Sequence, residues 1–211
     1  MYKLVIDLEM NGIGTEEIPM GEIIEIGAVI LNDDFEIVSE YNTYVKPDNI
    51  KISNGVQVLT NITIDRLLTA PSIKEALEEL IKSTPNIEET TLYTWSDSDT
   101  NAIVSELSSK DIHIDEVSKL CEEYVDIQEI FGRQVGIENR INLTKALNMI
   151  GLEFTGREHG ALADAINTAQ ILKEIETDQG VRKTIENINS YMTSEPLTSS
   201  IASLFSGIKL D

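Results

Sequence analysis

Five residues in three separated segments of the chain have side chains that could bind metal ions and transfer protons. Asp7 and Glu9 lie in KLVIDLEM, Asp99 in LYTWSDSDTNAI, and His159 and Asp164 in REHGALADAINTA. Acidic side chains that cluster without a basic partner are costly unless a cation neutralises them. If the fold brings the three segments together, the set implies a metal site as well as a reactive one.

Hydrolysis of a phosphodiester is the reaction that suits such a set. Attack by water requires that the water lose a proton, that charge on the phosphoryl oxygens be cancelled, and that the departing 3′ oxygen be stabilised. Two cations about 4 Å apart supply the last two requirements. Carboxylates hold such cations because Mg²⁺ prefers oxygen ligands. His159 is suited to accept the proton from water, since a histidine titrates near neutrality.

The first acidic pair is expected at the end of a buried strand. The apolar run from Leu4 to Ile6 predicts that strand, and Asp7 and Glu9 follow it. Because side chains alternate along a strand, the two acids point to the same side. By themselves they could be exposed acids at a strand end. The apolar run favours a central strand, whose end is where open α/β sheets bind ligands.

The second acidic pair, Asp97 and Asp99, follows a strand predicted at residues 91–95 and precedes a helix predicted from Asn101 to Leu107. Capping this helix is the alternative role, because Asp is common at helix N-termini. We expect one of the two aspartates to cap the helix.

The third segment opens a long helix that is predicted to reach about Ile175. His159 and Asp164 would lie about 140° apart around a continuous helix. Both can face one cleft if His159 precedes the helix, as Gly160 permits. The other histidine, His113, is expected to be an ordinary surface or structural group.

The remaining segments predict an α/β domain with a mixed five-stranded sheet flanked by helices. Residues 10–21 are expected to form a flexible loop. The other predicted elements are strands at 22–31, 35–45 and 124–127, and helices from Ser72 to Lys82 with a Ser72–Glu75 capping box, at 115–121, around Ile130, and after Asn142 with Gly151 at the end.

Length and composition indicate a globular domain with at most a short appendage. The 211-residue sequence has no apolar run long enough to span a bilayer and shows no signal peptide. Its single cysteine, Cys121, is expected to pack in the core and suits a reducing compartment. We therefore expect a cytoplasmic protein without membrane association.

The chain is strongly acidic, with 37 Asp and Glu against 16 Lys and Arg and a net charge of −21. Proteins that grip long duplexes usually carry a basic stripe, because counterion release supplies most of the non-specific affinity. The acidity confers solubility and argues against extended binding to nucleic acid. It is compatible with cleavage of a few nucleotides at the end of a nucleic-acid strand.

With these motifs in place, the chain resembles the DnaQ-like DEDDh exonucleases of the ribonuclease H-like fold, and among them the ERI-1-type branch. The resemblance covers roughly residues 1–177. It rests on the segments VIDLEM, EIIEIGAVIL, YVKP, VLTNIT, WSDSD, VDIQEIF and HGALADAINTA. The family's second motif is usually Trp-Gly-x-x-Asp, so Ser96 stands in place of the glycine and Asp99, rather than Asp97, takes the catalytic position.

The resemblance implies a role for each of the five residues. Asp7, Glu9 and Asp164 would ligate one divalent cation, Mg²⁺ or Mn²⁺, and Asp7 would also bridge to a second. Asp99 would hold the second cation, and His159 would activate the attacking water. The resemblance further implies that three residues line the pocket for the terminal nucleotide: Met10, Leu59 and Thr60.

The implied activity is metal-dependent 3′–5′ exonuclease action on single-stranded RNA or DNA ends, with release of 5′-mononucleotides. Two alternatives remain open: a non-catalytic protein-interaction module on the same fold, and a proofreading subunit of a DNA polymerase. Residues 178–211 are expected to form a helical extension that folds back or docks a protein partner. Its apolar face would consist of Ile201, Leu204, Phe205 and Ile208.

Overall fold

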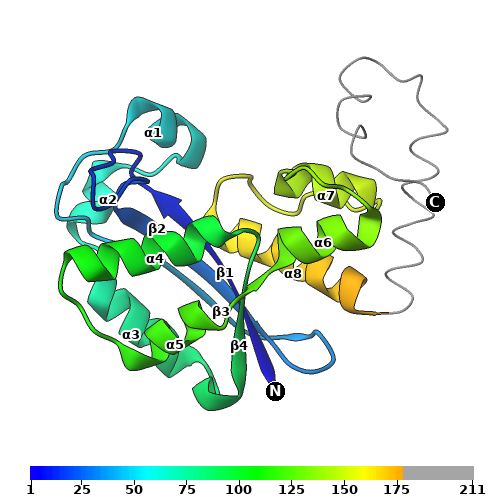
Figure 1. Ribbon diagram of the computed structural model, residues 1–211. Helices are drawn as coiled ribbons and strands as arrows, with labels where there is room; N and C mark the ends of the chain where they lie inside the picture. The colour runs from blue at the N-terminus through cyan, green and yellow to red at the C-terminus, as the bar shows by residue number, and fades with distance from the viewer. Residues whose placement is uncertain (178–211) are drawn as a thin grey trace.

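A mixed five-stranded sheet in the order β3-β2-β1-β4-β5 forms the centre of the computed structural model, which describes residues 1–177 (Figure 1). Neighbours β1 and β2, and β2 and β3, are antiparallel, whereas β4 runs parallel to both β1 and β5. The strands are β1 (Tyr2–Met10), β2 (Ile23–Leu31), β3 (Ile37–Tyr44), β4 (Thr90–Thr94) and β5 (Val125–Asp126). The predicted α/β class and mixed five-stranded sheet are confirmed.

Helices cover both faces of this sheet (Figure 1). Within the described residues they are α1 (Asn54–Thr60), α2 (Ile64–Leu68), α3 (Ile73–Ser83), α4 (Asp97–Ser109), α5 (Asp115–Glu122), α6 (Ile127–Val135), α7 (Leu143–Met149) and α8 (Ala161–Glu176), with a 3₁₀ turn at Ile87–Glu89. None of these helices is long and apolar enough to cross a bilayer.

The side chains of β1 point alternately to the two faces of the sheet, and each face is covered by its own layer of the core. Leu4 and Ile6 pack with α3, α4 and α5 on one face, whereas Val5 packs with α6, α7 and α8 on the other. Asp7 and Glu9 follow Val5 at intervals of two residues, so they point toward the α8 side. The strand pattern thus directs both acids to the layer that contains the third motif.

The start of α8 lies directly against β2 at Gly27. Gly27 pairs with Asp7 across the β1–β2 ladder. A Cβ atom at Gly27 would lie 2.0 Å from the Leu162 nitrogen and 2.1 Å from the Ala161 carbonyl carbon. Only glycine allows this approach, which brings the first turn of α8 beside Asp7.

Several helix ends form as the sequence predicts. Ser72 and Glu75 make the expected capping box at the start of α3. The Asn142 side chain accepts a hydrogen bond from the Lys145 backbone N–H and caps α7. Cys121 is buried in the layer formed with α3, α4 and α5, as predicted.

The expectation that Asp97 or Asp99 caps α4 is wrong. The helix begins at Asp97, earlier than predicted, and Ser96 is its N-cap. The Ser96 hydroxyl accepts a hydrogen bond from the Ser98 backbone N–H. Both aspartates therefore lie in the first turn, where negative charge is favoured by the helix dipole. The Asp99 carboxylate does not cap the helix and can accept a hydrogen bond from β1.

Local sequence patterns do not predict α1 and α2. Helices of seven and five residues carry little intrinsic signal, because such short segments are marginal in isolation. They are held by a small cluster in which Ile62 and Leu67 pack against Ile24 of β2. The predicted C-terminal extension and its apolar face lie outside the described residues, so the division at residue 177 stays a prediction.

Candidate active site

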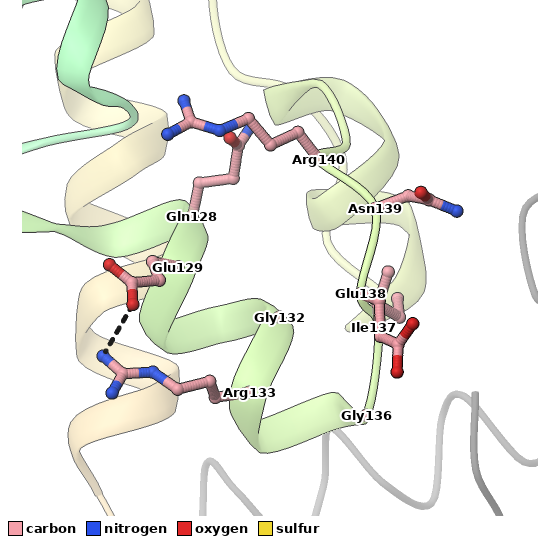
Figure 2. A pocket seen from close by; sticks show the side chains of 9 residues that line it. All are labelled: Gln128, Glu129, Gly132, Arg133, Gly136, Ile137, Glu138, Asn139 and Arg140. Atoms are coloured by element: carbon pink, nitrogen blue, oxygen red, sulfur yellow. Dashed lines mark ion pairs between the residues drawn. The ribbon is translucent and has the colours of Figure 1, made fainter. Parts of the chain in front are cut away.

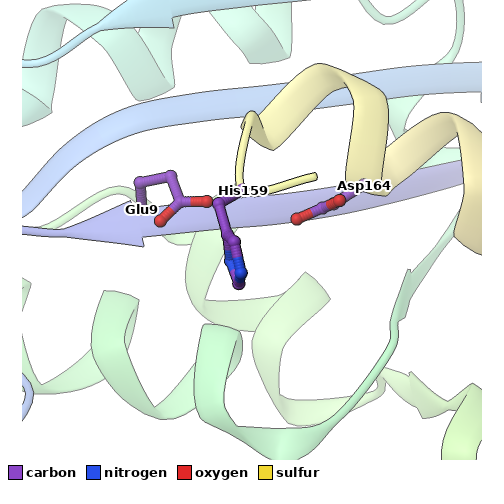
Figure 3. A group of neighbouring side chains, drawn as sticks. All are labelled: Glu9, His159 and Asp164. Atoms are coloured by element: carbon purple, nitrogen blue, oxygen red, sulfur yellow. The ribbon is translucent and has the colours of Figure 1, made fainter. Parts of the chain in front are cut away.

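Three of the five predicted residues come together at the end of β1. One ligand atom from each of Glu9, His159 and Asp164 lies within 4.8 Å of the other two (Figure 3). Glu9 comes from β1, and Asp164 from the first turn of α8. This group offers two carboxylates and an imidazole, all of which can bind a divalent cation.

His159 lies in the turn that precedes α8, as the sequence analysis required. The helix begins at Ala161, with Gly160 as its N-cap. His159 is exposed and adopts a left-handed backbone conformation with φ 60°. The proximity of its backbone N–H and of its imidazole lowers the pKa of Asp164. The turn therefore frees His159 from the helix periodicity that would have separated it from Asp164.

Asp99 reaches the same strand end from the opposite layer. It is 5% exposed, and its Oδ1 accepts a hydrogen bond from the Leu8 backbone N–H at 3.1 Å. Leu8 lies between Asp7 and Glu9, so this bond fixes the first turn of α4 to the acidic end of β1. Burial raises the pKa of Asp99 to about 7, with a further contribution from Asp164, although the hydrogen bond from Leu8 opposes the shift.

Asp7 completes the cluster. Its pKa is raised well above the ordinary range, first by burial and then by the charges of Asp99, Asp164 and Glu9. The mutual repulsion shows that the four carboxylates share one electrostatic environment. The fold thus brings all five predicted residues to the same edge of the sheet.

Burial and repulsion also shift the other two acids. The pKa of Glu9 rises to about 8 through burial and through Asp164 and Glu25, with Arg157 opposing the shift. The pKa of Asp164 rises to about 6 through burial, although His159 lowers it.

No Lys or Arg side chain in residues 1–177 forms an ion pair with any of these four carboxylates. Such a cluster is costly to ionise, and a divalent cation would remove that cost. The donor set therefore fits a metal-ion site.

The three residues expected to line a nucleotide pocket lie in different environments. Met10 is partly buried at the end of β1, and Leu59 on α1 is 54% exposed. Thr60 is buried, and its hydroxyl bonds within the chain to the Val56 carbonyl and the Ile62 N–H. Leu59 thus exposes apolar surface to solvent, while the Thr60 hydroxyl is already hydrogen-bonded to backbone groups of the same chain. Their contact with substrate stays a prediction.

Two further charged residues adjoin the site that sequence analysis did not identify. Glu25 of β2 lies directly opposite Glu9, and its carboxylate accepts a hydrogen bond from the Ala161 N–H at 3.4 Å. Arg157 precedes His159 by two positions and donates a hydrogen bond to the Thr60 carbonyl. An acid inside the apolar run of residues 22–31 was a visible signal for Glu25. Arg157 had no such signal.

A separate cavity of about 540 Å³ lies along α6 and the loop that follows it (Figure 2). Its charged groups are paired: Arg133 lies 3.7 Å from Glu129, and Arg140 lies 2.7 Å from Asp97. None of the five predicted site residues lines it. The five predicted site residues therefore lie at the acidic end of β1 and not in this cavity.

Comparison with known proteins is consistent with this geometry. ERI1 exoribonuclease 2 of Danio rerio is 27% identical over 199 residues, covering 84% of this chain and 35% of that protein. The 3′-5′ exoribonuclease 1 of Rattus norvegicus is 28% identical over 162 residues, covering 71% of this chain and 45% of that protein. The chain thus spans less than half the length of either relative.

A solved structure agrees in fold. The nuclease domain of 3′hExo, described as a DEDDh family member bound to rAMP, superposes with a TM-score of 0.72 at 25% identity. The alignment covers 84% of this chain and 92% of that domain. The RNase_T family, described as exonuclease, matches residues 4–172. Because that match spans most of the 211 residues, the chain belongs to the RNase_T exonuclease family.

Proposed function

We propose that this chain is a metal-dependent 3′–5′ exonuclease that releases 5′-mononucleotides from single-stranded ends. The observation that carries the proposal is the convergence of four carboxylates and His159 at the end of β1, in a chain of the exonuclease family. Both named relatives are exoribonucleases, which favours RNA over DNA as the substrate.

Asp7, Glu9, Asp99 and Asp164 would hold two divalent cations, Mg²⁺ or Mn²⁺. Their oxygen donors suit hard cations, and their raised pKa values reflect the charge that such cations would balance. Bound at this edge, the cations would neutralise charge on the phosphate and stabilise the leaving 3′ oxygen.

His159 would accept the proton of the attacking water. It is exposed at the mouth of the acidic cluster, and its ligand atom lies within 4.8 Å of those of Glu9 and Asp164. A positioned imidazole is a common general base for such a proton transfer.

A panel of 3′-labelled single-stranded RNA, DNA and dinucleotides, digested with Mg²⁺ or Mn²⁺, tests this proposal. We expect release of labelled 5′-mononucleotides by the wild type, faster from RNA, and none by Asp7→Ala. A suitable control is Glu40→Ala, since Glu40 is an exposed acid on β3. Undiminished hydrolysis by Asp7→Ala would show that the site is assigned wrongly.

A non-catalytic interaction module is the second candidate, and the net charge of −21 favours it. Metal binding and capture of a protein partner, without hydrolysis of any substrate in the panel, would support the module instead. The proofreading role, the partner segment and the cytoplasmic location remain predictions from the sequence.

A further inference from the structure

The turn that carries His159 is conformationally demanding. His159 has φ 60°, and Gly156, three positions earlier in the chain, has φ 93°. A left-handed conformation is unfavourable for a non-glycine residue, so surrounding contacts must hold it. The contacts that flank this turn therefore decide where the imidazole lies.

Arg157 holds one side of the turn. Its side chain crosses to α1, where the guanidinium donates a hydrogen bond to the carbonyl of Thr60, the last residue of that helix. Carbonyls in the last turn of a helix lack internal partners, so a cationic donor is favoured there. Since Arg157 is two positions from His159, the bond ties the His159 turn to α1.

Glu25 holds the other side. Gly160 has no side chain with which to cap α8, and the Glu25 carboxylate instead accepts the Ala161 N–H from the neighbouring strand. Glu25 is buried and shares a face of β2 with Gly27, against which Ala161 packs. A carboxylate at a helix N-terminus satisfies a free donor and complements the dipole.

We propose that Glu25 and Arg157 are positioning residues: Glu25 anchors the start of α8 on β2, and Arg157 ties the His159 turn to α1, so that His159 and Asp164 face Glu9. This rests on the proposed function for its catalytic consequence. The predicted effect of these residues on the position of His159 does not depend on the proposed function.

The histidine NMR spectrum tests the geometric part without any substrate. The chain has two histidines, so His113 serves as an internal reference for His159. We expect Arg157→Ala to shift or broaden the imidazole signals of His159 while those of His113 stay unchanged. Arg157→Lys should restore the wild-type signals in part, since an ammonium can donate to the same carbonyl. Unchanged His159 signals in Arg157→Ala would overturn the proposal.

Kinetics and metal binding test the catalytic part. We expect Arg157→Ala to lower kcat by about 10–100-fold, with KM within about twofold, because displacement of the base by about 1 Å has effects of this size. If KM rises while kcat is unchanged, Arg157 contacts substrate and the positioning role is wrong. Arg133→Ala is the matched control, since Arg133 is an exposed arginine on α6.

Glu25→Gln separates anchoring from metal binding. The amide oxygen can still accept the Ala161 N–H, so Mn²⁺ affinity by calorimetry should stay within about twofold of wild type, with kcat reduced less than in Glu25→Ala. A loss of Mn²⁺ affinity well above about 100-fold in Glu25→Gln, more than an indirect partner of a metal ligand costs, would identify a metal ligand and contradict the proposal. Absence of hydrolysis by the wild type would refute the proposed function alone, because the NMR result would still decide the positioning role.

Discussion

Asp97 and Asp99 lie two positions apart in the first turn of α4, yet the fold gives them opposite environments. Asp97 is partly exposed and pairs with Arg140 at 2.7 Å. Asp99 is buried and accepts the Leu8 N–H, in the middle of the acidic end of β1. Residue type alone does not distinguish the two, whereas burial and partner do.

Asparagine substitution separates these aspartates. We expect Asp99→Asn to lower the rate of hydrolysis by more than about 100-fold, because even indirect partners of metal ligands are worth 10–100-fold. The amide oxygen of Asn can still accept the Leu8 N–H, so the fold should persist. Asp97→Asn is the matched control and should keep activity within a few-fold. Equal loss in both variants, measured as kcat/KM with Mn²⁺, would contradict a metal-binding role specific to Asp99.

The raised carboxyl pKa values predict how stability depends on pH. Glu9, Asp99 and Asp164 have pKa values of about 8, 7 and 6 in the folded chain, whereas unfolded carboxyls titrate near 4. Between about pH 4 and 8 the unfolded chain therefore binds fewer protons than the folded chain, so the free energy of unfolding falls as pH rises. We expect Tm in chelator to drop by roughly 5 °C or more from about pH 5 to 8.

Mn²⁺ should reverse most of this loss at the higher pH, because a bound cation favours the ionised carboxylates. The 37 acidic residues repel one another in general, so a control is needed. The double variant Asp7→Asn, Glu9→Gln should show a shallower decline of Tm with pH in chelator. An equally steep decline in that variant would assign the effect to overall charge rather than to the cluster.

The sequence predicted that five residues converge, and they do, but it did not single out Glu25 or Arg157. The five lie in motifs whose local spacing is informative. Glu25 acquires its role from the β1–β2 register, which places it opposite Glu9. Arg157 acquires its role from α1, about a hundred positions away in sequence. Neither relation is visible in local spacing.

At the scale of elements, the site depends on how closely α8 approaches the sheet. Its first turn packs on Gly27 of β2, directly beside Asp7 in the β1–β2 ladder. The sequence predicted β1, β2 and α8 from their apolar patterns. It could not predict α1 and α2, because packing against Ile24, rather than helix propensity, stabilises them.

Gly27→Ala should separate α8 from the sheet. The added Cβ would lie about 2 Å from backbone atoms of Ala161 and Leu162, which cannot move independently of α8. We expect a destabilisation of at least about 3 kcal/mol, the upper end for overpacking, together with loss of hydrolysis.

Gly55→Ala on α1 is the control for this variant, because a Cβ there meets no atom within 4 Å. It should change the free energy of unfolding by less than about 1 kcal/mol, the difference between glycine and alanine inside a helix. Chemical denaturation measures the free energy of unfolding of both variants. A Gly27→Ala protein as stable and active as wild type would refute the close approach.

At the scale of the whole molecule, the acidic site belongs to an acidic protein with a net charge of −21. A polyanionic strand is therefore repelled at long range and is expected to bind through its end. The net charge therefore restricts the length of nucleic acid that can bind more than the sequence motifs do. The motifs predicted the chemistry, but substrate choice depends on loops and long-range charge, for which local sequence gives little signal.

Salt dependence tests this consequence. Added KCl screens repulsion between like-charged partners. We expect KM for a single strand of about 20 nucleotides to fall or stay within about twofold between about 25 and 200 mM KCl at constant Mg²⁺. Proteins that neutralise many phosphates lose affinity by about 10³-fold or more over a similar range. A rise in KM above about tenfold would show that a basic surface binds the strand.

Digestion of single-stranded RNA labelled at its 5′ end, with Mn²⁺ and with fragments resolved by length over time, tests whether this chain is a metal-dependent 3′–5′ exonuclease. We expect a ladder of labelled fragments that shorten from the 3′ end, abolished by chelator and by Asp164→Asn. Immediate release of the labelled 5′ nucleotide, a single internal cut, or an unchanged ladder in Asp164→Asn would contradict it.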